Sequence, residues 1–158
     1  LVTLIDGEMK FRMNNDWGTN YGDDGADGTL ELNGSNIVVT AGTYFATLNM
    51  NDLTYTLEPV THVWGLVGGA YNNWGATADA QFKRDWSKPF NDVWILENVT
   101  LIDGEYKFRS NNDWGTNYGD DGDDGILELN GSNLVTTAGT YSFSLDFSDP
   151  NAPTYAKN

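Results

Sequence analysis

The sequence contains no cysteine and only one histidine in 158 residues. Without cysteine there is no disulfide bond, no thiol nucleophile and no cysteine metal site, and nothing follows about the redox compartment. His62 stands alone in the sequence, whereas zinc binding or acid–base catalysis requires partner groups. We therefore expect His62 to be structural or solvated.

Positive charge is also scarce. Eight lysine and arginine residues face 23 aspartate and glutamate residues, which gives a net charge of −15. This imbalance argues against nucleic acid or an anionic membrane surface as a partner, and leaves neutral or cationic ligands. There is no run of about 18 apolar residues that would insert directly into a membrane.

No signal peptide is visible, and the first residues already resemble a strand. We therefore expect the chain to be a processed or partial product. A long internal repeat organises it: residues 2–49 align without gaps on residues 99–146, with 38 of 48 positions identical. Residues 62–97 have no counterpart ahead of the first copy. The repeat predicts a complete module over residues 62–158, and in residues 1–61 the C-terminal part of a module whose front strands are missing.

Short segments rich in β-branched and aromatic residues alternate with turn signals such as Asn130-Gly131. In the second copy these segments predict strands over residues 63–67, 93–101, 105–110, 126–129, 133–136 and 140–147. No stretch shows a sustained helical period with caps. We expect an all-β fold of immunoglobulin-like β-sandwich modules in tandem repeat.

The incomplete first copy raises a physical problem, because a sandwich without its front strands exposes an apolar face and unpaired strand edges. One solution is that the chain belongs to a longer tandem array. In the other, residues 1–61 share the strands of residues 62–97 in a permuted or swapped arrangement, within or between chains. We favour the array.

Two nearly identical stretches, residues 7–28 and 104–125, begin as strands and then become polar, glycine-rich loops that carry Trp17 and Trp114. A large aromatic ring in such a loop indicates a ligand site. Pyranose rings have apolar C–H faces and polar hydroxyl edges, so a sugar site needs aromatic plates together with fixed hydrogen-bonding groups.

The order and spacing of four residues resemble a known family. They are Trp74 at the end of the run GGAYNNW, Lys107 within GEYKF, then Trp114 and Asn133. This pattern resembles the glycogen-binding domain of the AMP-activated kinase β subunit and related starch-binding modules. The repeated NNDWGTNYGDDG loop is also similar to SusE and SusF-type starch-binding lipoproteins of the bacterial outer membrane, which carry such modules in tandem.

The resemblance implies that Trp74 and Trp114 form an aromatic platform for an α-1,4-glucan, and that Lys107 and Asn133 hydrogen-bond sugar hydroxyls. From the residues alone, two tryptophans at an angle would suit a curved α-glucan better than a flat β-glucan. Arg109 shares the strand face of Lys107 and could add a second donor. Asn111 and Asn112 are further candidate contacts at the rim.

In the first copy Lys10, Trp17 and Asn36 match Lys107, Trp114 and Asn133, but nothing matches Trp74. That copy therefore carries a partial site. Trp64 and Trp94 lie inside predicted strands, so we expect them in the core, whereas the pattern around Trp86 assigns it no role.

Clustered aspartates follow each tryptophan loop. Ca²⁺ takes six to eight hard oxygen ligands, so the cluster is a candidate calcium site, although its spacing is not that of an EF-hand. A solvated acidic turn is the alternative. The candidate ligands are Asp120, Asp121, Asp123 and Asp124, with Asp23, Asp24 and Asp27 in the first copy.

The same carboxylates lie in hydrophilic loops, whereas a glycosidase needs two across a cleft, one of them in an apolar pocket. No catalytic triad, phosphate loop or zinc motif is present. We therefore expect a non-catalytic protein that binds a polysaccharide or oligosaccharide and requires no cofactor. It would lie outside the cell or on the outer-membrane surface of a bacterium, beside identical modules or chains. The alternative function is a structural stalk or filament repeat, rigidified by calcium and without a glycan ligand.

Overall fold

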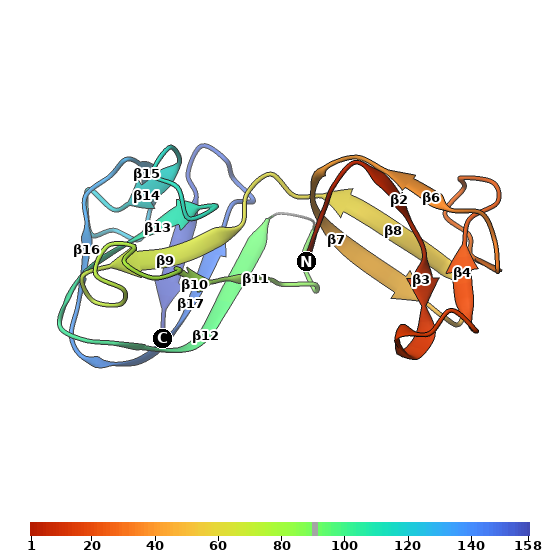
Figure 1. The fold of residues 1–158 in the computed structure, drawn as a ribbon. Coiled ribbons are helices and arrows are strands. Elements are labelled where there is room, and N and C mark those ends of the chain that lie inside the picture. Colours follow the sequence, from red (N-terminus) through yellow and green to blue (C-terminus); the bar gives the residue numbers. More distant parts are fainter. Residues whose placement is uncertain (90–91) are drawn as a thin grey trace. The chain divides into compact units, whose positions relative to one another are not determined.

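The computed structural model describes residues 1–89 and 92–158, and these form an all-β structure (Figure 1). The chain divides into two compact units, unit 1 (Leu1–Thr61) and unit 2 (His62–Asn158). The helical structure in the described part of the chain is a 3₁₀ turn, η1 (Met13–Asn15). Over the same residues, no helix has the length and apolar character needed to cross a bilayer.

Unit 2 contains two antiparallel sheets. The first is built from β9 (Trp64–Gly68), β10 (Ala80–Gln81), β13 (Gly104–Ser110), β14 (Asn117–Gly119), β15 (Glu128–Leu129) and β16 (Leu134–Thr136). Its order is β10-β9-β13-β14-β15, and β16 also pairs with β13. The second is built from β11 (Lys83–Arg84), β12 (Val93–Leu101), β17 (Gly139–Asp146) and β18 (Thr154–Lys157), paired in that order.

The core of unit 2 is aromatic. Side chains alternate along β13, so Tyr106 and Phe108 point to the same face. The Phe108 ring centre lies 6.0 Å from that of Phe143 on β17 and 5.7 Å from that of Tyr155 on β18. Phe108 is fully buried. The two sheets therefore pack face to face through these rings, as in a β-sandwich.

The tryptophans expected in the core are buried: Trp64 is 5% exposed and Trp94 1% exposed, which confirms that prediction. His62 is structural, because its ring stacks on Trp64 and its Nδ1 lies 3.0 Å from Ser110 Oγ. Trp86 is exposed, and the Arg84 guanidinium lies 4.4 Å from its ring centre.

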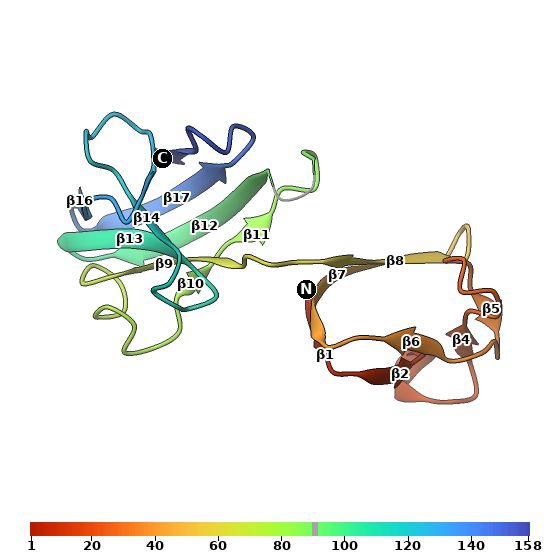
Figure 2. The ribbon, with the colours of Figure 1, turned by 90° about the horizontal axis from the view of Figure 1, so that it is seen from above.

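Unit 1 contains three small antiparallel sheets. Its strands are β1 (Val2–Leu4), β2 (Gly7–Met9), β3 (Phe11–Arg12), β4 (Asn20–Gly22), β5 (Glu31–Leu32), β6 (Ile37–Val39), β7 (Gly42–Asn49) and β8 (Thr54–Pro59). They pair as β1-β7-β8, β2-β6 and β3-β4-β5. Figure 2 shows β7 and β8 in one layer of the unit and β2 and β6 in another.

Nearly identical sequence folds differently in the two units. In unit 2 residues 104–110 form one strand, β13, which pairs with β9 along one edge and with β14 and β16 along the other. In unit 1 the matching residues pair with β4 and β6 along one edge, and the strand is interrupted at Lys10. Unit 1 has no counterpart of β9, so its other edge lacks the strand that keeps β13 continuous.

The strand predicted over residues 93–101 is found with these bounds, and the others have ends shifted by one residue. The exception is residues 126–129, which contribute only Glu128–Leu129 as β15. Ile126 instead forms an isolated bridge with Thr154. The prediction missed β10, β11, β14 and β18. These strands have two to four residues, too short to show a period, and they exist because a longer neighbour pairs with them.

Candidate binding site

Trp74 and Trp114 lie together on unit 2. Their ring centres are 6.0 Å apart and their planes are inclined by 41°. Trp114 is 42% exposed, and Trp74 is half-buried. The two rings therefore form a tilted aromatic surface that remains open to solvent on the Trp114 side.

The loop after β9 places Trp74. Its backbone turns back on Gly68, whose carbonyl oxygen accepts a hydrogen bond from the Trp74 N–H at 3.2 Å. Asn73 and Trp74 both adopt left-handed backbone conformations, which cost energy for residues other than glycine and need outside support. The indole Nε1 of Trp74 lies only 3.3 Å from where a Cβ on Gly69 would be, so glycine at position 69 makes room for the ring.

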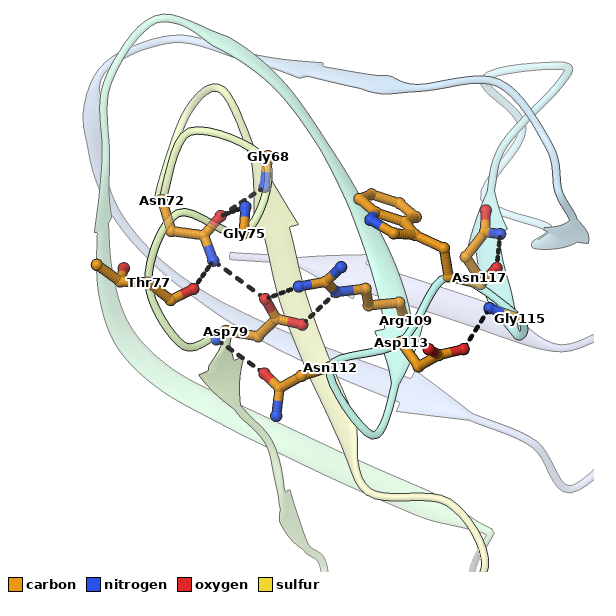
Figure 3. A network of polar contacts seen from close by, with 11 residues as sticks. Gly68, Asn72, Gly75, Thr77, Asp79, Arg109, Asn112, Asp113, Gly115 and Asn117 are labelled. Atoms are coloured by element: carbon orange, nitrogen blue, oxygen red, sulfur yellow. Dashed lines mark hydrogen bonds and ion pairs between the residues drawn. The ribbon is translucent and has the colours of Figure 1, made fainter.

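Asn72 provides that support from inside the loop (Figure 3). It is 6% exposed, and its Oδ1 accepts hydrogen bonds from the N–H groups of Gly68 at 3.2 Å and Gly75 at 3.1 Å. Its Nδ2 donates to the Thr77 carbonyl at 2.9 Å and to Asp79 Oδ1 at 3.0 Å. One buried amide therefore joins both ends of the Trp74 loop to Asp79.

Asp79 forms a buried ion pair with Arg109 beneath the loop (Figure 3). Arg109 Nε donates to Asp79 Oδ2 at 2.6 Å and Nη2 donates to Oδ1 at 2.8 Å, with both side chains less than a tenth exposed. The Asp79 N–H also donates to Asn112 Oδ1 at 3.0 Å. A Cβ at Gly65 would lie 2.6 Å from the Asp79 Cβ, so position 65 must be glycine for Asp79 to fit.

Arg109 connects this ion pair to the aromatic surface. Its guanidinium carbon lies 4.6 Å from the Trp114 ring centre, within the range of a cation–π contact. Trp114 is also held through its backbone, because its carbonyl accepts a hydrogen bond from Asn117 Nδ2 at 3.0 Å. Arg109, predicted as a sugar donor, is engaged by Asp79 and positions Trp114. Asn112 anchors Asp79 and is itself exposed.

Of the two predicted polar contacts, Lys107 lies on β13 and Asn133, just before β16, is hydrogen-bonded to Glu105 of β13. Glu105, Lys107 and Arg109 alternate on β13, so this row spans about 13 Å. Lys107 is only 9% exposed, and burial lowers its pKa, with partial opposition from the charge of Asp121. Asn133 is exposed, and its Nδ2 donates to Glu105 Oε2 at 3.0 Å. A ligand in solution could therefore reach Asn133 directly, whereas only a small part of Lys107 is exposed to solvent.

Unit 1 carries half of this arrangement. Arg12 lies 4.7 Å from the Trp17 ring centre, and Asn36 Nδ2 donates to Glu8 Oε2 at 2.9 Å. Lys10 lies between them on the same stretch. Because residues 62–97 have no equivalent here, unit 1 has no counterpart of Trp74 or Asp79, and Trp17 is 61% exposed.

Asp120, the most buried member of the aspartate cluster in unit 2, accepts hydrogen bonds from its own loop. Its Oδ1 accepts from the N–H groups of Gly122 and Asp124 at 3.0 and 3.2 Å, and its Oδ2 from Gly125 at 2.9 Å. Burial raises the pKa of Asp120, but these backbone hydrogen bonds together outweigh it, so the pKa lies below its ordinary value. The carboxylate therefore holds the loop closed.

The neighbouring aspartates act in the same way. Asp121 Oδ1 accepts from the N–H and hydroxyl of Ser132 at 2.7 and 2.8 Å, and Asp124 Oδ1 accepts from the Ile126 N–H at 2.9 Å. Asp123 occupies a left-handed position of the turn. The loop of unit 1 repeats these bonds through Asp23, Asp24 and Asp27. Among residues 1–89 and 92–158, no three or more His, Cys, Asp or Glu side chains are grouped to hold a metal ion.

Sequence reasoning missed two residues that build the site, Asn72 and Asp79. Asn72 lies within the GGAYNNW sequence on which the family resemblance was based, so its position could have marked it as part of the site. Asp79 had no local signal, because its partner Arg109 is 30 residues away. A scan of protein-family models and a search of curated proteins found no match to this chain.

Proposed function

We propose that unit 2 is a non-catalytic module that binds an α-glucan such as starch, glycogen or a maltooligosaccharide. The observation that carries this proposal is the pair formed by Trp74 and Trp114, with ring centres 6.0 Å apart and planes inclined by 41°. An α-1,4-linked chain curves, so successive glucose rings present faces at an angle, whereas a flat β-glucan presents coplanar faces. Tilted plates therefore fit the curved chain better.

The proposed site also needs polar groups for the sugar hydroxyls. Asn133, which is exposed, and Lys107, which is 9% exposed, would hydrogen-bond sugar hydroxyls, and Asn112 accepts a hydrogen bond from the Asp79 N–H. Arg109 supports Trp114 from beneath. This division matches the starch-binding families that the sequence resembles, apart from Arg109, whose role here is to position the ring.

The proposed setting is a secreted or outer-membrane surface protein of a bacterium, in which immunoglobulin-like modules recur in tandem. Two rings and two or three hydrogen bonds provide about 4–7 kcal/mol, which corresponds to affinities from about 1 mM to about 10 μM. Such weak single sites suit repetition, because a polymer presents the same epitope many times and linked modules gain avidity.

Isothermal titration of the intact chain with maltoheptaose tests the proposal. Saturable binding in the stated range is expected for the wild type, and its loss in Trp74→Ala and in Trp114→Ala. Trp17→Ala is the matched control, because it removes the same ring from the same loop in the unit that lacks Trp74. It should bind as the wild type does.

Cellohexaose, titrated in parallel, separates α-glucan from β-glucan binding, and equal affinity for both sugars would overturn the assignment to α-glucans. If the intact chain binds neither maltoheptaose nor insoluble starch, the tryptophan pair serves packing alone. The structural stalk would then be the better description.

A further inference from the structure

Unit 1 has an open apolar recess of about 180 Å³. Its walls are formed by Phe11, Arg12, Met13, Tyr21, Leu48 and Met50. Leu48, Met50 and Met13 are 46%, 43% and 52% exposed, although large apolar side chains gain stability from burial. Clustered exposed apolar residues mark a surface that is normally covered by another group.

The internal repeat shows which group covers the same surface in unit 2. A shift of 97 residues converts Tyr21 into Tyr118 and Met50 into Phe147. In unit 2 the Trp64 ring stacks on Phe147, with centres 4.6 Å apart and planes inclined by 16°. It also contacts Tyr118 edge-on, at 5.6 Å. The recess in unit 1 is therefore the position that Trp64 fills in unit 2.

The backbone next to the recess also lacks the partner strand that is present in unit 2. In unit 2, β9 pairs antiparallel with β13, so that Leu66 faces Phe108, Gly65 faces Arg109 and Trp64 faces Ser110. The matching residues of unit 1 pair with β4 and β6 along their other edge. β2 (Gly7–Met9) and β3 (Phe11–Arg12) thus present an exposed strand edge, and Phe11 and Arg12 also line the recess. An exposed edge is a template for adding a strand.

We propose that unit 1 binds an added β-strand with the chemistry of β9, in the register of β9 on β13, and that the tryptophan of this strand enters the recess. The source is the front strand of another module of this kind. Main-chain hydrogen bonds along residues 9–13 would hold the strand, and the tryptophan would make the binding specific.

A simple exchange of β9 between two copies does not meet this need. The β9 of residues 62–158 is already used by unit 2, so exchanging it between two copies would fill one acceptor and empty another. Pairing of two unit 1 edges would join the backbones but would place no tryptophan in the recess. A separate strand satisfies the edge and the recess together.

Hydrogen exchange of the full chain with a synthetic peptide of residues 62–71 tests the proposal. At a peptide concentration about ten times the dissociation constant, exchange of the amides of residues 9–13 should slow about tenfold, because about a tenth of the sites remain free. A peptide with Trp64→Ala should give no protection at the same concentration.

Two chain variants locate the binding surface. Leu48→Arg places a charge in the recess and should abolish the protection by the wild-type peptide. Val38→Arg is the matched control, because Val38 is 78% exposed on β6 and does not line the recess. This variant should retain the full tenfold effect.

The register can be read by disulfide trapping, since the chain has no cysteine of its own. Facing residues on paired strands lie within the range of Cα separations that a disulfide spans. The variant Arg12→Cys should cross-link to a peptide carrying Gly65→Cys and remain reduced with one carrying Val67→Cys.

The proposal would be overturned by absence of peptide protection, by equal protection from the Trp64→Ala peptide, or by full protection in Leu48→Arg. It would also fail if residues 9–13 became protected without peptide as the chain concentration rose. That result would assign the edge to self-association of unit 1.

Discussion

The guanidinium of Arg109 lies 4.6 Å from the centre of the Trp114 ring, while two of its nitrogens are held by the buried carboxylate of Asp79. This contact links the interior of unit 2 to its exposed aromatic surface. A ring supported from beneath keeps its orientation without a ligand, so little ordering would be needed when a ligand binds.

Asp79→Asn should destabilise unit 2 by about 3–5 kcal/mol, because it leaves the buried Arg109 charge without its counter-charge. Urea unfolding measures this change. Arg12→Ala is the control, since Arg12 is exposed and unit 1 has no equivalent of Asp79. That substitution should change stability by no more than about 0.5 kcal/mol. A loss below about 1 kcal/mol in Asp79→Asn would show that the ion pair is not needed for the fold.

Trp114→Ala should lower the free energy of unfolding by only about 1 kcal/mol, because the ring is 42% exposed. Trp64→Ala should cost about 3–5 kcal/mol, since its ring fills the core beside Phe147. Denaturant titrations of the two variants provide the comparison. Equal losses would mean that Trp114 is a packing residue, which would weaken the binding proposal.

Acid should destabilise unit 2 through Asp120. The pKa of this residue is below its ordinary value of 3.8 in the folded state, so the charged form stabilises the fold above that value. The contribution is lost as the pH falls through the lower, folded-state pKa. Stability of the wild type should therefore decrease between about pH 5 and about pH 2.

Urea unfolding of Asp120→Asn at neutral pH and at about pH 2 tests whether Asp120 causes this loss of stability. At neutral pH the substitution should cost about 1–3 kcal/mol, because an amide cannot accept hydrogen bonds through both of its polar atoms. Its stability should then fall less with acid than that of the wild type. Asp23, whose pKa is also lowered, is present in both proteins and cancels from the difference. Identical pH profiles would remove Asp120 from the explanation.

Removing calcium should leave the melting temperature unchanged. Oxygens of Asp120 and Asp124 already accept hydrogen bonds from their own loop, and Asp121 accepts them from Ser132 beyond β15. A thermal melt with a chelator, and a second with added Ca²⁺, measures the effect. A rise in melting temperature with Ca²⁺, reversed by the chelator, would instead support the calcium site.

Backbone exchange should differ between the two copies of the strand. Amides of residues 107–110 belong to a strand paired on both edges, whereas residues 10–13 lack the partner on one edge. We expect exchange at 107–110 to be slower by about a hundredfold, because more of the unit must open before these amides are exposed. Equal rates would show that the edge of unit 1 is covered in solution.

Much of this structure could be predicted from local patterns. Alternation along residues 105–110 predicted that Tyr106 and Phe108 share a face, and both rings lie in the core. The polar, glycine-rich surroundings of Trp114 indicated an exposed ring. The shortest strands could not be predicted, because strands of two to four residues are specified by the neighbours that pair with them.

Contacts between distant parts of the chain decided the rest. Asp79 acquires its role from Arg109, 30 residues later, and no pattern around either residue indicates the other. Leu48 and Leu145 occupy matching positions of the repeat, yet Leu48 is 46% exposed and Leu145 is fully buried. Local sequence determined that both positions become strands with an apolar side chain. Burial was decided by the neighbouring segments: Leu145 lies between Trp94 on β12 and Tyr155 on β18, whereas β1 of unit 1 pairs only with residues 42–44 and leaves Leu48 without a partner strand on that side. A side chain is removed from water by whichever segment packs over it.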